Sequence, residues 1–590
     1  MSLTADQVME LVQSLIWLLA GVGVFIVGMN FMSDALEKSA GSGMKRMLEK
    51  ISNNRISGVG IGAGVTAIIQ SSSATSVMVI GLVNAGVMTL MQATPIIMGA
   101  NIGTTITGVL VALKNDIFNM IMYLLAFAGV MMGFSQKEKM KIAGSLCCGL
   151  GLIFVGLDVM SSEDAFGNAL VQDMFKGIFA KIDFPLLLIL VGAIFTALIQ
   201  SSSAATGVVI TMVGSGVIDL KLALFIILGA NIGTCVTALL ASIGANANSK
   251  RVALIHFTFN TIGTAFFTAI IWIFTDPVVN MLESAFPGTD QMALQMRVSL
   301  FHVVFNVTTT LLLLPFVKYL VDYSCRVIKD KKEDDEALAS ITIDERLLST
   351  PAIALDNCFI VATDMAHWSQ QSIDDSIKAL FNYNPTLDKH IREAEKMTDK
   401  YEDKLGSYLV KLSSSSISEK ESANASMLLK VIGDFERISD HARNIMFSGA
   451  ELSEKKLAFT DEAKAEIAMM TDAVSEIVDL AFSSFINNDT SLAVKVESLE
   501  EVIDGMKEKM RTNHTKRLQK GNCSLDTGFV WSDLLTNLER ISDHCSNIVG
   551  AVVDFENNDL NTHKALKKIR RNGEEFDREY ENYSKKYQLA

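Results

Sequence analysis

The sequence predicts an all-α protein: a polytopic helical membrane region with two inverted repeats, each carrying a re-entrant hairpin, followed by a soluble six-helix bundle. Of 590 residues, 49% are hydrophobic and the mean hydropathy is +0.33, which is too apolar for an ordinary soluble chain. Several apolar runs approach the roughly 20 residues that cross a bilayer. After residue 350 the pattern becomes helical, with few glycines and only two prolines, Pro351 and Pro385.

Charge separates the two parts. Residues 1–330 hold 18 Lys+Arg and 18 Asp+Glu, so the net charge of −14 resides in the remainder. An acidic C-terminal part argues against nucleic acid as a partner. Seven cysteines without a CxxC pair predict neither a disulfide framework nor a zinc site. No GxxxxGK[ST] loop, ATPase motif or Ser-His-Asp arrangement is evident, so the sequence predicts that the protein is not an enzyme.

Seven segments are predicted to span the bilayer, and two further apolar stretches, each interrupted midway by polar residues, are predicted to be re-entrant hairpins. Basic loops are expected in the cytosol and acidic loops outside. This places the N-terminus outside and the C-terminal domain in the cytosol. The spanning segments are 9–33, 95–113, 117–134, 142–162, 222–242, 252–275 and 298–322, and the hairpins are 57–90 and 184–218.

The membrane region, residues 1–325, contains an internal duplication. The QSSSA run at Gln70–Ala74 recurs at Gln200–Ala204, and the GANIGT run at Gly99–Thr104 recurs at Gly229–Thr234, both offset by 130 residues. Residues 70–107 and 200–237 share 21 identities in 38 positions. The duplication defines repeat 1 at about 10–135 and repeat 2 at about 142–275, with 298–322 as a final helix.

The predicted topology gives the two repeats opposite orientations. Inverted repeats with broken apolar segments are typical of secondary transporters whose site lies at the midplane. Packing through small residues is the structural alternative, but it explains Gly and Ala and leaves the polar runs unexplained. Buried polar groups cost free energy unless they are satisfied, and in spanning segments they are usually functional. The duplication therefore favours transport.

Each QSSS run lies at a hairpin tip, where helical hydrogen bonding must break. Free N–H groups and a positive helix end suit an anion, and free carbonyl and hydroxyl oxygens suit a hard cation such as sodium. Neither hairpin core holds Lys or Arg, so a bound anion requires neutral donors and a co-bound cation. The residues alone predict a cation-coupled transporter of a small polar or anionic solute.

The paired QSSSAT(S/T) and GANIGT runs resemble the type II sodium/phosphate cotransporter family, as do the HxxFN segments at His256–Asn260 and His302–Asn306. The resemblance covers about residues 10–320 and implies that inorganic phosphate moves with sodium through a site made by both hairpins. It assigns binding to Gln70, Ser71, Ser72, Ser73, Thr75, Ser76, Gln200, Ser201, Ser202, Ser203 and Thr206, and secondarily to Asn101, Thr104, Asn231 and Thr234.

The copies differ where Thr75 becomes Ala205 and Thr105 becomes Cys235. Each change removes a hydroxyl, so a sodium site in the second copy is expected to be altered or absent. Three further polar residues allow two interpretations. His256 and His302 are either core residues or ligands and proton relays, and Asp158 is either a functional intramembrane carboxylate or faces a wet cavity.

A charged linker is predicted at 326–349 and a helical bundle at 350–590. The bundle is also duplicated: ERISDHxxNI, beginning at Glu436, recurs as the same letters from Glu539. Carboxylates spaced i, i+4 share one helix face. Such a face can bind a hard cation, iron or manganese. The alternative is that the carboxylates form ordinary salt bridges to Arg437, Arg443 and Arg540. The candidate metal ligands are Glu395, Asp399, Glu436, Asp440, Glu500, Asp504, Glu539 and Asp543.

This paired motif resembles the PhoU family. The resemblance implies a six-helix bundle of two three-helix halves, a divalent ion or iron cluster on its acidic faces, and a role in regulating phosphate transport. Together the sequence predicts sodium-coupled phosphate transport across the cytoplasmic (inner) membrane, import or export, regulated by the cytosolic domain. The partners are phosphate, sodium and the lipid bilayer, with a homodimer through either domain. The alternatives are a membrane-anchored phosphate sensor, which binds without flux, and an anion channel, whose flux ignores sodium.

Overall fold

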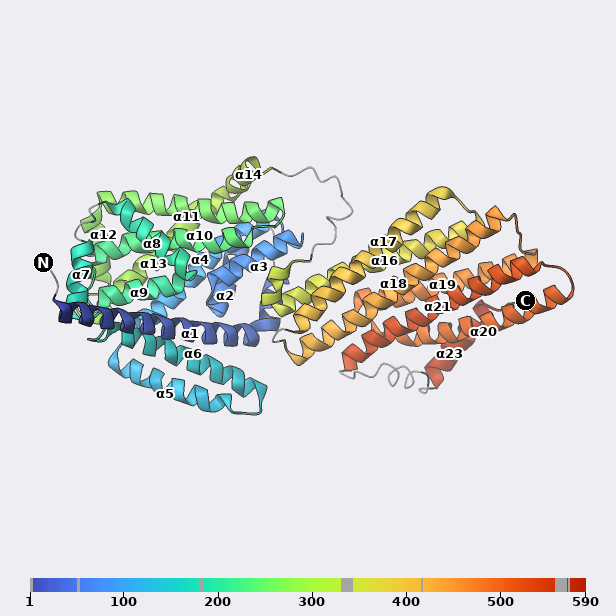
Figure 1. Cartoon of the computed structure of the whole chain (residues 1–590), viewed down its shortest axis with the longest axis horizontal. Helices are drawn as coiled ribbons and strands as arrows, with labels where there is room; N and C mark the ends of the chain where they lie inside the picture. Colours follow the sequence, from blue (N-terminus) through green and yellow to red (C-terminus); the bar gives the residue numbers. More distant parts are fainter. Residues whose placement is uncertain are drawn as a thin grey trace. The chain divides into compact units, whose positions relative to one another are not determined.

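The computed structural model describes residues 4–49, 54–179, 182, 184–329, 343–414, 417–557, 570 and 573–589. The chain divides into two compact units, Met1–Asp334 and Asp335–Ala590. Every regular element in the described ranges is helical, which confirms the all-α prediction (Figure 1). Part of the first basic loop, residues 50–53, and most of the predicted linker, residues 330–342, lie outside the described residues.

The first unit is built from long apolar helices joined by short turns. Their starts follow from local capping: Thr89 and Gln92 form a capping box at the start of α4, and the Asp219 carboxylate accepts from the Leu222 N–H at the start of α10. The elements are α1 (Ala5–Glu49), α2 (Arg55–Ile69), α3 (Ser72–Asn84), α4 (Leu90–Ala112), α5 (Asp116–Gly133), α6 (Glu138–Ser161), α7 (Ala169–Phe179), α8 (Pro185–Ile199), α9 (Ser202–Gly214), α10 (Leu220–Ala241), α11 (Ala247–Ile273), α12 (Thr275–Ala285), α13 (Gln291–Leu313), η1 (Leu314–Phe316) and α14 (Val317–Val327).

Within the described ranges, six helices are long and apolar enough to cross a membrane, and each matches a predicted span to within two residues at its C-terminal end or contains it. The seventh predicted span, 117–134, is α5, one of the shorter apolar helices. The last predicted span, 298–322, lies within the helical stretch Gln291–Val327, although this stretch is not α-helical throughout. The helix begins at Gln291 and is interrupted at Leu314–Phe316, because Pro315 lacks the N–H and clashes with the preceding turn. Helices α7 and α12 were not predicted.

The first polar-interrupted stretch forms a hairpin that returns to its starting side. Helices α2 and α4 pack in parallel: a Cβ added at Gly58 would lie 2.8 Å from Pro95 Cβ, near both starts, and one at Gly103 would lie 2.7 Å from Thr66 Cβ, near the end of α2. A short turn joins α3 to α4, so α3 must return to the end where α2 began. Helices α8, α9 and α10 repeat this arrangement, with Gly233 beside Thr196.

The two repeats are inverted, as the sequence predicts. Helices α1 and α6 start the repeats and run antiparallel, because Gly21 packs against Met160 whereas Gly28 packs against Ile153 (Figure 1). The hairpin bases also lie at opposite ends of α10. The second hairpin leads directly into the start of α10. The Asn246 N–H, just beyond its end, donates to Asn84 Oδ1 at the base of the first hairpin over 2.9 Å.

In its described ranges the second unit contains six long helices, as predicted, and a shorter helix, α23, packed on α20. Helices α16–α18 contact one another, α19–α21 contact one another, and α18 lies against α21 (Figure 1). Pro351 and Pro385 occupy helix first turns, where the missing N–H is not needed. The elements are η2 (Glu345–Ser349), α16 (Pro351–Phe381), α17 (Pro385–Ser413), α18 (Glu419–Glu454), α19 (Asp461–Asn487), η3 (Thr490–Leu492), α20 (Ala493–Gln519), α21 (Leu525–Asn557) and α23 (Glu574–Lys586).

Candidate substrate site between the hairpin tips

Each hairpin tip is a break in helical backbone. Gln70 and Gln200 end α2 and α8 with φ of 59°, in the left-handed region that non-glycine residues rarely adopt. Ser71 and Ser201 then cap α3 and α9, their hydroxyl oxygens accepting from the N–H groups of Ala74 and Ala204. The first N–H groups of a helix have no partner within it, so both tips present donors and a positive helix end. Strain of this kind is concentrated at functional sites.

The two tips meet, although 130 residues separate them. The Ser73 hydroxyl donates to the Gln200 carbonyl over 3.4 Å and accepts from Thr237 Oγ1 over 3.3 Å. In the symmetric arrangement, the Ser203 hydroxyl donates to Thr107 Oγ1 over 3.4 Å. Thr107 in turn donates to Gln70 Oε1 over 2.8 Å. Four of the predicted binding residues therefore form one polar cluster with Thr107 and Thr237.

Other predicted hydroxyls surround this cluster. Ser72 and Ser202 are the first residues of α3 and α9, and are only 4% and 5% exposed. Ser76 and Thr206 occupy equivalent positions one turn further along, and neither hydroxyl has a hydrogen-bond partner among the described residues. Buried polar atoms are normally paired. The unpaired hydroxyls indicate a place where a ligand or water completes the structure.

The hydroxyl missing from the second copy has a structural consequence. In the first copy the Thr66 hydroxyl donates to Thr75 Oγ1 over 2.9 Å, and Thr75 donates to the Ser71 carbonyl over 3.0 Å. In the second copy Ala205 replaces Thr75, and the hydroxyl of the fully buried Thr196 has no partner in the described structure. The group of three oxygens in the first copy, from Thr66, Thr75 and the Ser71 carbonyl, is therefore incomplete in the second copy.

The secondary candidates divide into two groups. Asn101 donates to Asn260 over 2.6 Å and Asn231 donates to Asn306 over 2.8 Å, so both HxxFN segments supply the amide partner of a GANIGT asparagine. Thr104 and Thr234 instead donate to carbonyls of their own helices, Ala100 and Ala230, at 3.0 Å each. Only the lone pairs of these two hydroxyls remain for a ligand.

Sequence reasoning missed Thr107 and Thr237 as site residues, and it did not assign roles to Asn260 and Asn306. A signal for the threonines was available, because they are identical residues at the 130-residue offset. The signal for the asparagines was the equal spacing of the two HxxFN segments. What the sequence did not reveal was which helix each residue faces.

The other intramembrane polar residues are placed clearly. His256 is fully buried, and neither ring nitrogen has a partner within the described ranges. His302 lies near the site, since its Nδ1 would be 3.6 Å from a Cβ added at Gly108, next to Thr107. Asp158 lies elsewhere: its carboxylate is 3.1 Å from Lys114 Nζ and accepts from Tyr123. Asp158 of α6 is therefore a charge partner of the turn between α4 and α5.

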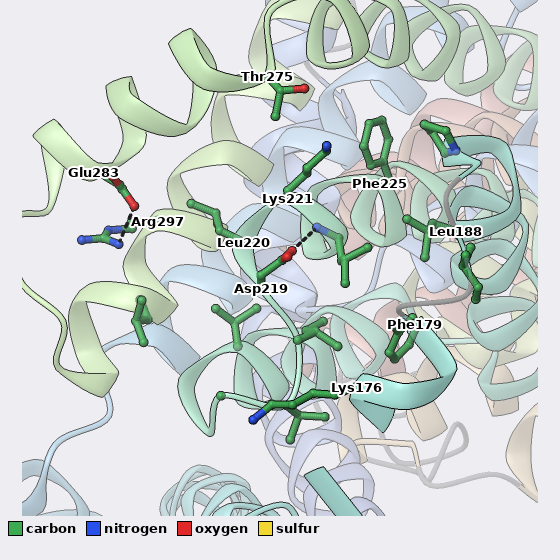
Figure 2. A pocket seen from close by; sticks show the side chains of 18 of the residues that line it. Lys176, Phe179, Leu188, Asp219, Leu220, Lys221, Phe225, Thr275, Glu283 and Arg297 are labelled. Carbon is green, nitrogen blue, oxygen red and sulfur yellow. Dashed lines mark hydrogen bonds and ion pairs between the residues drawn. The ribbon is translucent and has the colours of Figure 1, made fainter. Parts of the chain in front are cut away.

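A cavity of about 770 Å³ lies beside the base of the second hairpin and does not include the tip residues. Figure 2 shows Lys221 and Asp219 from the start of α10 near Phe225 and Leu188, and the ion pair of Arg297 with Glu283 on one side. The Arg297 and Glu283 atoms are 3.4 Å apart. The tips are packed together, whereas the base of the second hairpin adjoins open space.

In the first half of the bundle, three of the predicted carboxylates lie close together. Burial, followed by the charges of Asp440, Glu402 and Asp399, raises the pKa of Glu436 to about 7. The fourth predicted carboxylate, Glu395, instead pairs with Arg443 Nη1 at 2.5 Å. This half therefore combines an excess of negative charge with one of the anticipated salt bridges.

The second half holds a tighter cluster. Asp504, Glu539 and Asp543 each offer an oxygen, all within 4.8 Å of one another. Basic side chains already contact this face: Lys507 lies 2.9 Å from Glu539, and Arg540 lies 3.1 Å from Asp543. Glu500 is paired with Arg570 at 2.9 Å, and burial, opposed by Arg570, raises the pKa of Glu500 to about 7. Both anticipated arrangements, clustered acids and salt bridges, are present.

Inverted repeats whose broken helices meet at a shared polar cluster have the architecture of secondary transporters. The profile of the Na+/Pi-cotransporter family matches residues 24–162 and 164–282, and that of the PhoU domain matches 362–447 and 467–552. The chain belongs to the Na+/Pi-cotransporter family and carries a PhoU domain in its C-terminal unit. It is thus a membrane protein of a transporter family.

Three relatives illustrate the similarity. YjbB of Salmonella typhimurium, a protein named for inorganic phosphate export, is 24% identical over 92% of this chain and 98% of its own length. YqeW of Bacillus subtilis, whose name carries no activity, is 31% identical over 49% of this chain and 91% of its own length. The sodium-dependent phosphate transport protein 2C of Mus musculus is 51% identical over 13% of this chain and 14% of its own length.

Proposed function

We propose that this chain carries inorganic phosphate across the cytoplasmic membrane together with sodium, through a site formed where the two hairpin tips meet. The observation that supports the proposal most strongly is the symmetric polar cluster of Ser73 with Thr237 and Ser203 with Thr107. The substrate is supported by the family and by the relatives named for phosphate export and for sodium-dependent phosphate transport.

The site chemistry explains why sodium is required. Two helix starts and the hydroxyls of Ser72, Ser73, Ser202 and Ser203 can donate to phosphate oxygens. Neither tip holds Lys or Arg, so the anionic charge is balanced by a co-bound cation. Hydroxyl and carbonyl oxygens are suitable sodium ligands. We assign a sodium ion to the first copy, where Thr66, Thr75 and the Ser71 carbonyl lie together, and none to the equivalent place in the second.

The C-terminal bundle is proposed to regulate this transport from the cytosol. Its second-half cluster, Asp504, Glu539 and Asp543, suits a hard divalent cation or manganese, which would have to displace Lys507 and Arg540. A bound ion would neutralise the carboxylates that now repel one another. Transport by such a carrier is reversible, and the full-length similarity to YjbB favours export.

The test is phosphate uptake into proteoliposomes with and without an inward sodium gradient. Parent protein should accumulate phosphate only with sodium, and Ser72→Ala/Ser202→Ala should reduce accumulation at least tenfold. Ser284→Ala, which changes an exposed hydroxyl on α12, is the matched control and should transport normally. Phosphate binding without sodium-driven flux would identify a sensor, and flux indifferent to sodium would identify a channel.

A further inference from the structure

Helix α13 carries a continuous polar face through the membrane unit. Its residues Gln295, Ser299, His302, Asn306 and Thr309 follow the i, i+4, i+3 spacing that places side chains on one side of a helix. All five are buried, with exposures of 0 to 3%. The face extends about 21 Å at 1.5 Å per residue, which is most of the hydrocarbon thickness.

Most of this polar face is unpaired. Asn306 bonds to Asn231, but Gln295 Oε1 and Nε2, Ser299 Oγ, His302 Nδ1 and Thr309 Oγ1 have no hydrogen-bond partner in the part of the chain that the structure describes. An unpaired buried polar group is destabilising, and in a bilayer no solvent relieves it. One such atom is a local imperfection, but five on one helix face require a common explanation.

The face is opposed by glycines from three other helices. A Cβ added at Gly214 of α9 would lie 2.6 Å from Gln295 Nε2, and one at Gly263 of α11 would lie 2.4 Å from Thr309 Cγ2. At Gly108 of α4 the added Cβ would lie 3.6 Å from both Ser299 Oγ and His302 Nδ1. The polar atoms therefore face bare backbone, where little side-chain bulk separates the helices.

The middle of this face lies near Gly108 of α4, next to a residue that bonds to both hairpin tips. Gly108 follows Thr107, which bonds to both Gln70 and Ser203. From this contact the polar face extends in both directions along α13, toward Gln295 near one end of the helix and toward Thr309 near the other. The face is thus positioned to connect the proposed site with both sides of the membrane.

We propose that this unpaired face of α13 lines the route by which phosphate and ions reach the hairpin tips, and that it is hydrated in a conformation other than the one described above. The proposal rests on the transport function proposed above. Hydration satisfies the groups that are unpaired here, and the opposing glycines allow a water-filled gap to open without displacing side chains. The ligand on this route is the hydrated anion itself, which forms hydrogen bonds with the neutral donors and acceptors of the α13 face.

Thiol accessibility tests the route directly. Gln295→Cys and Ser299→Cys are placed singly in the full chain, reconstituted, and treated with a charged, membrane-impermeant thiol reagent, with the seven native cysteines of the parent as background. Val298→Cys is the matched control, because Val298 is equally buried on the adjoining face of α13 among aromatic side chains. We expect labelling of Ser299→Cys at least fivefold above that of Val298→Cys, slowed by phosphate plus sodium.

Equal labelling of Ser299→Cys and Val298→Cys in every condition would overturn the proposal and make the face a static packing feature. Labelling without sodium-driven uptake by the parent would leave the route standing and overturn the proposed function.

A second test does not depend on whether the cysteine variants fold. Gly108→Ala meets only ordinary contacts, so it should fold and bind phosphate, yet slow uptake severalfold by narrowing the gap. Gly60→Ala, where open space surrounds the added methyl, should leave uptake unchanged, and an unaffected rate in Gly108→Ala would contradict the route.

Discussion

At the scale of single residues, the duplication makes each copy a control for the other. Among the residues that the structure describes, the buried Thr196 hydroxyl has no partner where Thr66 has one, because Ala205 replaces Thr75. Ala205→Thr should therefore stabilise the membrane unit by about 1 kcal/mol, the net worth of one hydrogen bond. The measurement is thermal unfolding of the purified protein in detergent. Thr75→Ala should lower the midpoint, and a lower midpoint for Ala205→Thr would show that the second tip has no room for the methyl and hydroxyl.

A second residue-scale prediction concerns Glu436, whose folded-state pKa of about 7 is raised above its usual 4.5. Stability from such a group is fully present below about pH 4.5 and is lost as the pH rises through 7. Glu436→Gln should avoid this loss and unfold about 2–4 °C above the parent at pH 8, for a gain of about 1 kcal/mol, with little difference at pH 5. Thermal unfolding of the C-terminal unit in the full chain at both pH values measures this.

The exposed Glu508 provides the control for this prediction. The difference in unfolding midpoint between Glu508→Gln and the parent should be the same at pH 5 and at pH 8.

A divalent cation offers an independent check on the acidic faces. If manganese raises the unfolding midpoint of the parent, the increase should fall when Asp543→Asn removes one of the three clustered carboxylates. A stabilisation unchanged by Asp543→Asn would place the ion elsewhere.

The tip residues could be identified from the sequence because two identical polar runs in apolar surroundings have few structural explanations. Their partners could not. Thr107 looks like any helix-interior threonine until the fold brings Ser203 to it. Likewise, Asp158 was noticed as a charge in a spanning helix, but its partner Lys114 lies 44 positions away along the chain, in the turn between α4 and α5. The packing of α5 on α6 brings the two residues together.

At the scale of elements, the GANIGT motif has two structural roles, and the sequence alone did not show which residue serves which. Its asparagine pairs with an HxxFN asparagine, and its first glycine allows helix contact: a Cβ at Gly99 would lie 2.1 Å from the Val59 carbonyl oxygen, and one at Gly229 1.9 Å from that of Ile189. Small residues allow such close approach in membrane helices. The helix pairs α2–α4 and α8–α10 therefore depend on these glycines.

Gly99→Ala should separate α2 from α4 and prevent stable assembly, since a backbone oxygen at 2.1 Å cannot move aside without shifting the helix. The expected result is aggregation on size-exclusion chromatography in detergent, with loss of phosphate uptake. Gly60→Ala on the same helix pair has no neighbour within 4 Å and should behave as the parent. A monodisperse, active Gly99→Ala protein would contradict the packing described here.

Element boundaries illustrate where sequence patterns stop being informative. The apolar cores of the spanning helices were located from hydropathy, but polar ends extend them, as α1 extends to Glu49 beyond the predicted end at 33. Hydropathy also did not separate α13 from α14, because apolar residues continue through Pro315, where the α-helix gives way to a 3-10 turn. Helices α7 and α12 were missed because only one side of each is apolar, which gives no spanning signal.

At the scale of the whole molecule, the two units have separable tasks. The proposed site is formed within residues 1–329, and both hairpin tips and the α13 face belong to that unit. The Bacillus subtilis relative is similar to this chain over 91% of its own length, and that similarity covers 49% of this chain. The bundle, in contrast, contributes acidic faces and a PhoU domain.

A chain ending after Lys329 should therefore still accumulate phosphate in proteoliposomes under a sodium gradient, at a rate within about twofold of the full chain, because every group that binds or gates the solute remains. It should lose any response of the rate to divalent cations, since the acidic clusters are gone. A folded truncated protein that binds phosphate but does not transport it would mean that the bundle drives the conformational exchange. Regulation and transport would then be one process, and the hairpin tips alone would be a receptor.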